Sequence, residues 1–348
     1  MNTSISHLLL VNSKFISPFV VTKMSEVSSF SFLYGKVSKS FSSLLFNNGF
    51  RSKVSFRNGL ISQFLSQSIV SLESSDFNFV DMVFTKSNQA AMTFNSASDN
   101  VYIERCSFSS YNAGYAISVT YVNSIFVIST AFFNNLNGYY VLSDGYDIKR
   151  TDFNYTTEYF SGFGQTSLCS YTGARQTFNF RYNNATSNLF TTYSSSFFFV
   201  FCPINSECAS YCIGKNNRGA SLMGFDLGGA SIFIRYFCFL NSTVSSHYFL
   251  LWETHSNPYF IDCVFYQNGF ANANGYYSTG IGHITLIRCV FDVYFSLSQL
   301  RYVVPLQDCV FNSTSSPNCA METPILTNHL GKSLIPRTIV LALLTINQ

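Results

Sequence analysis

Apolar and polar residues alternate over short stretches of this 348-residue chain, and one short pattern returns many times. Its clearest form is apolar-x-apolar-x-x-Cys-x-Phe, which occurs at 101–108, 284–291 and 304–311, with a shorter version at 260–265. Each half of the pattern alternates with period two, which is typical of a short strand with one inward face. The two halves are out of phase by one residue, so the pattern predicts a bend between two strands.

Looser copies of the pattern carry another small residue in the cysteine position. Ten aligned positions between 75 and 309 are on average about 26 residues apart. Short strands separated by bends, and repeated at this interval, predict the coils of a parallel β-helix. Helical repeats would instead show a helical period, and leucine-rich repeats would show Leu-x-x-Leu-x-Leu. Neither pattern occurs in this sequence.

The repeat is clear over residues 65–315, which we predict to be a single all-β solenoid domain. Residues 1–64 carry fainter copies and are expected to form degenerate coils or an N-terminal cap. The segment 204–226 breaks the period and is expected to loop out. The period is lost after Phe311, so residues 316–348 are expected to form a C-terminal cap or tail, since terminal repeats of solenoids are atypical.

Stacked coils predict columns of equivalent side chains, because neighbouring strands lie about 4.8 Å apart. The position before the cysteine alternates in sign in the last copies, at Asp262, Arg288 and Asp308, as expected for an outward salt-bridge ladder. Parallel side-chain directions favour reduced thiols over disulfides in the inward cysteine column. The two predicted inward columns are Cys263, Cys289 and Cys309, and Phe265, Phe291 and Phe311.

Two further motifs accompany the coils. Phe-x-x-Asn recurs at 132–135, 180–183 and 265–268, and the run Gly-Gly-Ala-Ser-Ile at 228–232 approximates Gly-Gly-Ala-Ile. With these motifs, residues 65–315 resemble right-handed parallel β-helix proteins of the pectin-lyase-like superfamily. More narrowly, they resemble the polymorphic-outer-membrane-protein-like surface proteins of bacteria and of protists such as trichomonads. The resemblance implies a right-handed coil and a cell-surface or extracellular protein, and it carries no information about chemistry.

Composition narrows the class of protein further. Aromatic residues make up 18% of the chain, with 38 Phe and 22 Tyr, whereas charged residues make up only 11%. This balance excludes a disordered chain and a helical bundle. The net charge of +3 is too small to indicate a nucleic-acid partner. No apolar run is long enough to span a membrane, and residues 1–21 do not form a convincing signal peptide, so a surface location is expected as part of a longer precursor.

One segment offers weak catalytic candidates, namely two carboxylates and two cations close together in the chain. Hydrolases of glycans need paired carboxylates about 5–9.5 Å apart. Polygalacturonase-like enzymes imply Asn-Thr-Asp, Asp-Asp, Gly-His-Gly and Arg-Ile-Lys elements, of which only fragments occur at 282–284 and 148–150. A turn is therefore favoured here, and a divergent lyase or hydrolase acting on a uronic-acid-type polysaccharide is the alternative function. The candidates are Asp144, Asp147, Lys149 and Arg150.

The densest cysteine cluster is Cys202-x5-Cys208-x3-Cys212. A zinc site would need Cys-x2-Cys pairs, so a loop disulfide or free thiols are both favoured over a metal. His247 and His255 flank Glu253. A metal site needs side chains that point to one place, and a spacing of this width on strands does not predict that arrangement. No metal and no cofactor are predicted.

Exposed aromatic residues are the remaining candidates. Tyr139, Tyr140, Tyr276 and Tyr277 lie in Asn/Gly-rich segments, where their rings could stack on sugars or on a partner's side chains, or simply cover the core. The leading hypothesis is a non-catalytic β-helix that binds a glycan or a host or cell-surface protein. An intracellular scaffold is a third interpretation, favoured if all ten cysteines are free thiols.

Overall fold

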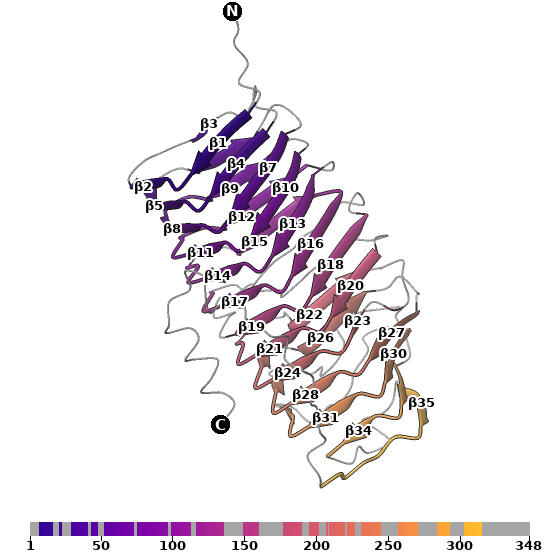
Figure 1. Cartoon of the computed structure of the whole chain (residues 1–348). Helices are drawn as coiled ribbons and strands as arrows, with labels where there is room; N and C mark the ends of the chain where they lie inside the picture. Colours follow the sequence, from indigo (N-terminus) through magenta and orange to yellow (C-terminus); the bar gives the residue numbers. More distant parts are fainter. Residues whose placement is uncertain are drawn as a thin grey trace, which may run out of the picture.

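A computed structural model shows a stack of short parallel strands (Figure 1). All regular structure in its described residues is β, in 35 strands. No helix in this part of the chain is long and apolar enough to cross a membrane. The structure describes residues 7–16, 21–22, 29–40, 43–47, 52–72, 75–96, 99–112, 116–135, 149–159, 177–189, 195–201, 207, 209–219, 221–226, 231–244, 257–270, 284–292 and 303–314.

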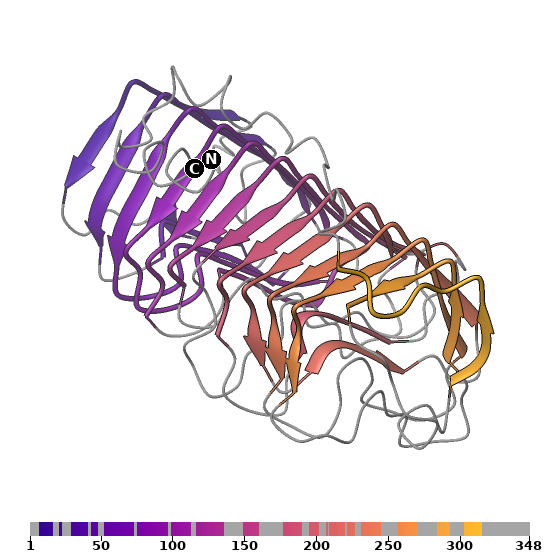
Figure 2. The same ribbon diagram turned by 90° about the horizontal axis from the view of Figure 1, so that it is seen from below.

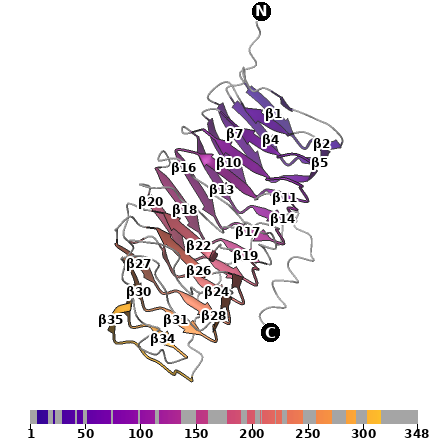
Figure 3. The ribbon, with the colours of Figure 1, turned by 180° about the vertical axis from the view of Figure 1, so that it is seen from behind.

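The first face of the solenoid is a 13-stranded parallel sheet in which the order of strands is their order in the chain. In Figures 1 and 3 the colours therefore run along the stack from indigo at β1 to yellow at β35. Its strands are β1 (His7–Val11), β4 (Ser29–Leu33), β7 (Ser52–Arg57), β10 (Ser75–Val80), β13 (Asn100–Glu104), β16 (Ser124–Ile128), β18 (Arg150–Asn154), β20 (Thr177–Arg181), β23 (Ala209–Ser210), β27 (Ser231–Arg235), β30 (Asn257–Ile261), β33 (Ile284–Ile287) and β35 (Val303–Gln307).

The second face is a 12-stranded parallel sheet that follows the first after a sharp bend in every coil (Figure 2). Most of its strands are very short, so one side chain in each points inward. They are β2 (Lys14–Ile16), β5 (Lys36–Ser40), β8 (Leu60–Phe64), β11 (Val83–Thr85), β14 (Ser107–Ser109), β17 (Ala131–Phe133), β19 (Thr157–Tyr159), β21 (Asn184–Thr186), β24 (Ile213–Lys215), β28 (Cys238–Leu240), β31 (Val264–Tyr266) and β34 (Val290–Phe291).

In the described residues, the third face consists of separate sheets. Five strands cover the N-terminal coils, three cover later coils, and two further strands form a pair of their own. The five are β3 (Val21–Thr22), β6 (Leu45–Asn47), β9 (Ile69–Ser71), β12 (Met92–Asn95) and β15 (Ile117–Tyr121); the three are β25 (Arg218–Gly219), β29 (Thr243–Val244) and β32 (Gly269–Phe270); the pair is β22 (Ser195–Phe201) and β26 (Ser221–Asp226).

The predicted all-β parallel solenoid is confirmed, with coils that are somewhat shorter than expected. In the first sheet Asp76 pairs with Asn100, which lies 24 residues further along the chain. The coil from β1 to β4 is shorter than this, and the coils between β18 and β23 are longer. The predicted mean was too long for two reasons. The first aligned position, 75, lies in β10 and not at the corner that follows Asp81, and the alignment omitted the short N-terminal coils.

The described part of residues 1–64 lies in the same three faces as the rest of the solenoid, as β1 to β8. The segment 204–226 does not leave the stack as a whole, because β23 and β24 pair with strands of the coils before and after them. Two strands of this segment pair outside the long sheets: β25 pairs with β29, and β26 pairs with β22. Residues 316–348 lie outside the described residues.

Phenylalanine rings form the core of the second face. Phe84, Phe108 and Phe132 are buried and stack with centroids 5.0 and 5.1 Å apart. A second column, with centroid separations of 4.8 to 5.2 Å, contains Phe239, Phe265, Phe291 and Phe311. Between the two columns the inward position is filled by Glu158, Ala185 and Gly214.

Two corners with left-handed backbone bend the coils. The described non-glycine residues with positive φ lie at these corners, except Lys39 and Gln63, which lie within β5 and β8. The first corner joins the first sheet to the second, and the φ angles of its left-handed residues lie between 49° and 57°. The second corner follows the second sheet. Because non-glycine residues seldom adopt this conformation, its repetition shows that the stacked coils impose it.

The Phe-x-x-Asn motif joins one coil to the one before it. The Asn183 side chain donates to the carbonyl oxygen of Phe153 at 2.8 Å and accepts from the backbone N–H of Thr156 at 2.8 Å. The asparagine therefore bridges a Phe-x-x-Thr segment of the preceding coil. Three other asparagines make the same pair of contacts, namely Asn135, Asn217 and Asn268.

Removing this bridge should destabilise the solenoid. Asn183 is 2% exposed, so Asn183→Ala leaves a buried carbonyl and a buried N–H without their side-chain partner. We expect a loss of about 2–3 kcal/mol in the free energy of unfolding, measured by guanidinium denaturation. Asn154→Ala is the matched control, because Asn154 is only partly buried, and it should change stability by less than about 0.5 kcal/mol. Equal effects of the two substitutions would contradict the bridge.

Candidate interaction surface

The first corner has an inward position that carries a small hydrogen-bond donor in several coils. The thiol of Cys106 lies 3.5 Å from the carbonyl oxygen of Phe79 in the preceding coil and 3.3 Å from that of Glu104. In the next coil the Thr130 hydroxyl donates to the carbonyl oxygen of Ile128 at 3.0 Å. Small donors fit the corner and satisfy its carbonyl groups, whereas Met82 and Phe237 fill the same position in other coils without a donor.

The cysteine column of the last coils has the same geometry. The Cys289 thiol lies 3.3 Å from the carbonyl oxygen of Phe260 and 3.5 Å from that of Ile287. Cys263 and Cys309 make equivalent contacts one coil before and one coil after. All three cysteines are free, and the hydrogen bond with the Cys263 thiol, together with burial, raises the pKa of Cys289. These thiols are neutral packing groups at the corner.

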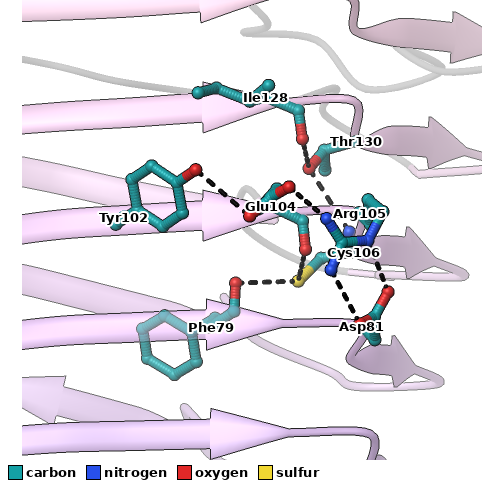
Figure 4. A network of polar contacts seen from close by, with 8 residues as sticks. All are labelled: Phe79, Asp81, Tyr102, Glu104, Arg105, Cys106, Ile128 and Thr130. Atoms are coloured by element: carbon teal, nitrogen blue, oxygen red, sulfur yellow. Dashed lines mark hydrogen bonds and ion pairs between the residues drawn. The ribbon is translucent and has the colours of Figure 1, made fainter.

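The outward position of the first corner carries an ion-pair network in the N-terminal half of the chain (Figure 4). Arg105 binds Asp81 of the preceding coil through two nitrogens, at 2.8 and 3.0 Å, and also pairs with Glu104. The Tyr102 hydroxyl donates to Glu104 at 3.1 Å, and burial together with this carboxylate raises the pKa of Tyr102. Every charge in the network has an opposite partner, so the network serves to join two coils.

A second ion pair occupies the same row near the C-terminal end of the solenoid. Arg288 binds Asp262 through two nitrogens, each at 2.7 Å. Asp308 follows in the next coil, so the signs alternate along the row. The alternation avoids like charges on neighbouring strands, which would repel.

Between the two ion pairs, four consecutive coils place a tyrosine at the outward corner. Tyr155, Tyr182, Tyr211 and Tyr236 stack with centroids 4.7, 5.1 and 4.7 Å apart and interplanar angles of 3°, 6° and 15°. We call these four residues the tyrosine row. Tyr155, Tyr211 and Tyr236 are each 38–41% exposed, so the row is a continuous aromatic strip on the surface.

The backbone of the tyrosine row is unusual for its residue type. All four residues have φ between 55° and 57°, a region where a bulky side chain is a genuine outlier. Most other coils place Asn, Asp, Ser or Arg at this corner, and Asn and Asp tolerate the conformation better. Four consecutive coils accept a bulky ring in this conformation, and the exposed aromatic strip that the rings form is the candidate interaction surface.

Arginine side chains border the tyrosine row on the side of the first sheet. Arg181 and Arg235 directly precede Tyr182 and Tyr236, and Arg181 is exposed. Arg235 lies 3.4 Å from Glu207 and over the ring of Phe233. The surface therefore combines phenol edges and hydroxyls with guanidinium groups.

The catalytic candidates are only partly described. Asp144 and Asp147 lie outside the described residues. Lys149 and Arg150 are exposed, and Arg150 forms an ion pair with Asp152 at 2.7 Å. Arg150 is therefore engaged in a contact within its own strand. Of the binding candidates, Tyr139, Tyr140, Tyr276 and Tyr277 all lie outside the described residues.

The cysteine cluster is also partly described. Cys212 is buried in the inward corner position and forms no disulfide, with its thiol near the carbonyl oxygens of Phe180 and Ser210. Cys238, in β28, is disulfide-bonded. Within the described ranges, no group of three or more His, Cys, Asp or Glu residues could hold a metal ion. The other members of the cluster and of the histidine segment, which lie outside the described residues, are Cys202, Cys208, His247, Glu253 and His255.

Comparison with known proteins gives no relative for this chain. No protein-family model matches it, and neither a curated protein nor a solved structure matches it significantly. The candidate surface therefore rests on the geometry of the corner.

Sequence reasoning missed the tyrosine row, although a signal was present. In four consecutive copies a tyrosine directly precedes the inward corner residue, at 155, 182, 211 and 236. The looser copies were aligned at 151, 180 and 202, whereas the structure places their inward corner residues at 156, 183 and 212. Three of the four tyrosines therefore fell outside the aligned column, and the correct register was needed to show the row.

The corner donor can be tested at Cys106 with two replacements that are isosteric with each other, threonine and valine. Buried valine is ordinarily preferred to buried threonine, because the hydroxyl must be desolvated. Since Thr130 already fills this position in the next coil, we expect Cys106→Thr to be more stable than Cys106→Val by about 1 kcal/mol. Denaturation of both variants measures the difference. A more stable valine variant would show that the position selects size alone.

The buried thiol also predicts a pH dependence. Burial raises the pKa of Cys106 from 9.0 to about 12. The neutral thiol therefore stabilises the fold fully below pH 9, and this contribution is lost as pH rises toward 12. At pH 10 the wild type should have lost roughly 1 kcal/mol relative to pH 8. The Cys106→Thr variant lacks this contribution, so the difference between the two proteins isolates it; parallel pH profiles would contradict it.

Proposed function

We propose that this chain is a non-catalytic binding solenoid that presents the tyrosine row to a protein partner at a cell surface or outside the cell. The observation that carries the proposal is the run of four stacked, partly exposed tyrosines at strained corner positions. Tyrosine and arginine are enriched at the energetic centres of protein interfaces. The row with Arg181 and Arg235 beside it has this composition.

The orientation of the rings favours a protein over a glycan. Sugars stack on aromatic faces, but the faces within the row already cover one another at 4.7–5.1 Å. The row offers outward ring edges and hydroxyl groups, and a free ring face only at its ends. Edges and hydroxyls suit backbone and side-chain groups of a protein surface.

The finer family assignment is part of the proposal. We propose a right-handed coil, as in the pectin-lyase-like superfamily, and a relationship to the polymorphic-outer-membrane-protein-like surface proteins. Support comes from the Phe-x-x-Asn motif, whose phenylalanine packs in the core and whose asparagine bridges coils at Asn135, Asn183 and Asn268. Right-handed crossovers are also the general rule for parallel strands.

The proposed location has separate support. Cys238 is disulfide-bonded, and disulfides persist mainly in oxidising compartments. The free thiols at the corner do not argue against such a compartment, because Cys106, Cys212, Cys263 and Cys289 are buried.

A cell-binding assay tests the proposal. The labelled protein is applied to cells, and a variant carrying serine at all four positions of the tyrosine row is applied in parallel. We expect the variant to bind more weakly by about tenfold or more, since one aromatic residue at the centre of an interface contributes about 1.4 kcal/mol or more. Circular dichroism checks that the variant is folded.

Tyr34→Ser is the matched control. Tyr34 lies at the same corner of another coil and is 61% exposed, but no tyrosine occupies this position in the neighbouring coils. It should leave binding unchanged. Treating the cells with a protease should abolish binding. Binding that survives protease but is lost after glycosidase treatment would replace the protein partner with a glycan, and equal binding of the serine variant would reject the surface.

A further inference from the structure

The tyrosine row has a second chemical property that does not depend on a binding partner. Oxidative coupling of two tyrosines requires two phenoxyl radicals to meet ring against ring. Neighbouring rings in the row are already held 4.7–5.1 Å apart and nearly parallel, on four consecutive coils. Groups held in this way react with a high effective concentration.

We propose that Tyr155, Tyr182, Tyr211 and Tyr236 are a site of oxidative cross-linking, at which a one-electron oxidant joins neighbouring rings as dityrosine. The oxidant class is a haem peroxidase with hydrogen peroxide. The rings are accessible to it, since Tyr155, Tyr211 and Tyr236 are 38–41% exposed.

The chemistry balances without any further reactant. Each of two phenols loses one electron and one proton to give a phenoxyl radical. The radicals form a carbon–carbon bond between their Cε atoms, and the two hydrogens on those carbons move to the phenol oxygens. The product has lost two hydrogens in total, and the two electrons and two protons reduce one hydrogen peroxide to two waters.

The row is close to the geometry of the product. In a coupled pair the ring centres are separated by two ring radii and one carbon–carbon bond, slightly less than the 4.7 Å found for Tyr155–Tyr182 and Tyr211–Tyr236. Rotation of the rings about χ2 turns their edges toward each other, and this torsion is broad in tyrosine. Coupling therefore requires little displacement of the backbone.

The cross-links would tie the coils of the solenoid together. Each pair of linked residues lies at the same corner of neighbouring coils, so each bond closes a whole coil. A covalent link that closes a loop restricts the unfolded chain and raises stability. The coils that carry the tyrosine row include the two longest intervals between paired residues of the first sheet, from Arg150 to Thr177 and from Phe180 to Ala209. A link across these coils closes the longest loops.

Treatment of the purified protein with horseradish peroxidase and hydrogen peroxide tests the proposal. We expect dityrosine fluorescence in protein that remains monomeric on a denaturing gel. Mass spectrometry should find peptide pairs lighter by two hydrogens and joined at Tyr155–Tyr182, Tyr182–Tyr211 and Tyr211–Tyr236. The oxidised protein should unfold at a higher temperature than the untreated protein.

Two variants separate the row from other tyrosines. Tyr182→Phe keeps the stacked ring but removes two of the three neighbouring pairs, so only the Tyr211–Tyr236 link should remain in the row. The double variant Tyr182→Phe/Tyr211→Phe should lose all of it and the gain in unfolding temperature. Tyr34→Phe is the control and should change neither. Dityrosine that maps to other pairs, or that forms only between molecules, would overturn the proposal whether or not the row binds a partner.

Discussion

The parallel register between successive coils is the constraint on which the rest of the structure depends. Each strand pairs with its equivalent in the next coil, so every side chain lies beside the residue in the same position one coil away. The register is held at the corners, where the left-handed backbone turns the chain at the same point each time. Asparagines such as Asn183 then hold the corner of one coil to the preceding coil.

This register explains why the core is built from columns of one residue type. A ring that stacks on Phe265 must have nearly the same size and orientation. Phe291 meets this condition, since its ring centroid lies 4.8 Å from that of Phe265. Where the column is interrupted by Glu158, Ala185 and Gly214, the coils are also at their longest. Core packing and coil length therefore change together in the middle of the solenoid.

Much of this fold could be predicted from the sequence, because inward positions repeat with strong preferences. The alternation around Cys289 and Phe291 is enough to indicate two strands and a bend. The coil length was less accurate, since the N-terminal copies are faint. The tyrosine row was missed because outward positions are weakly constrained, and nothing in a single copy, such as Tyr211 beside Cys212, distinguishes it from a surface residue. Only the register between coils makes four separate tyrosines into one surface.

The register also limits which surfaces a solenoid can repeat. Like charges in neighbouring coils repel, so the sign of the charge changes between Asp262 and Arg288. A surface of such alternating charges has little net charge. Aromatic rings attract their equals, and a tyrosine can therefore follow a tyrosine over several coils. Asparagine shares this property, since the Asn241 amide donates to Asn216 at 2.8 Å. A uniform strip on a parallel solenoid must be made of residues that attract themselves. The tyrosine row is such a strip, and its exposed aromatic area is available to a partner. In an asparagine pair the amide groups already hydrogen-bond to each other and offer less to a partner.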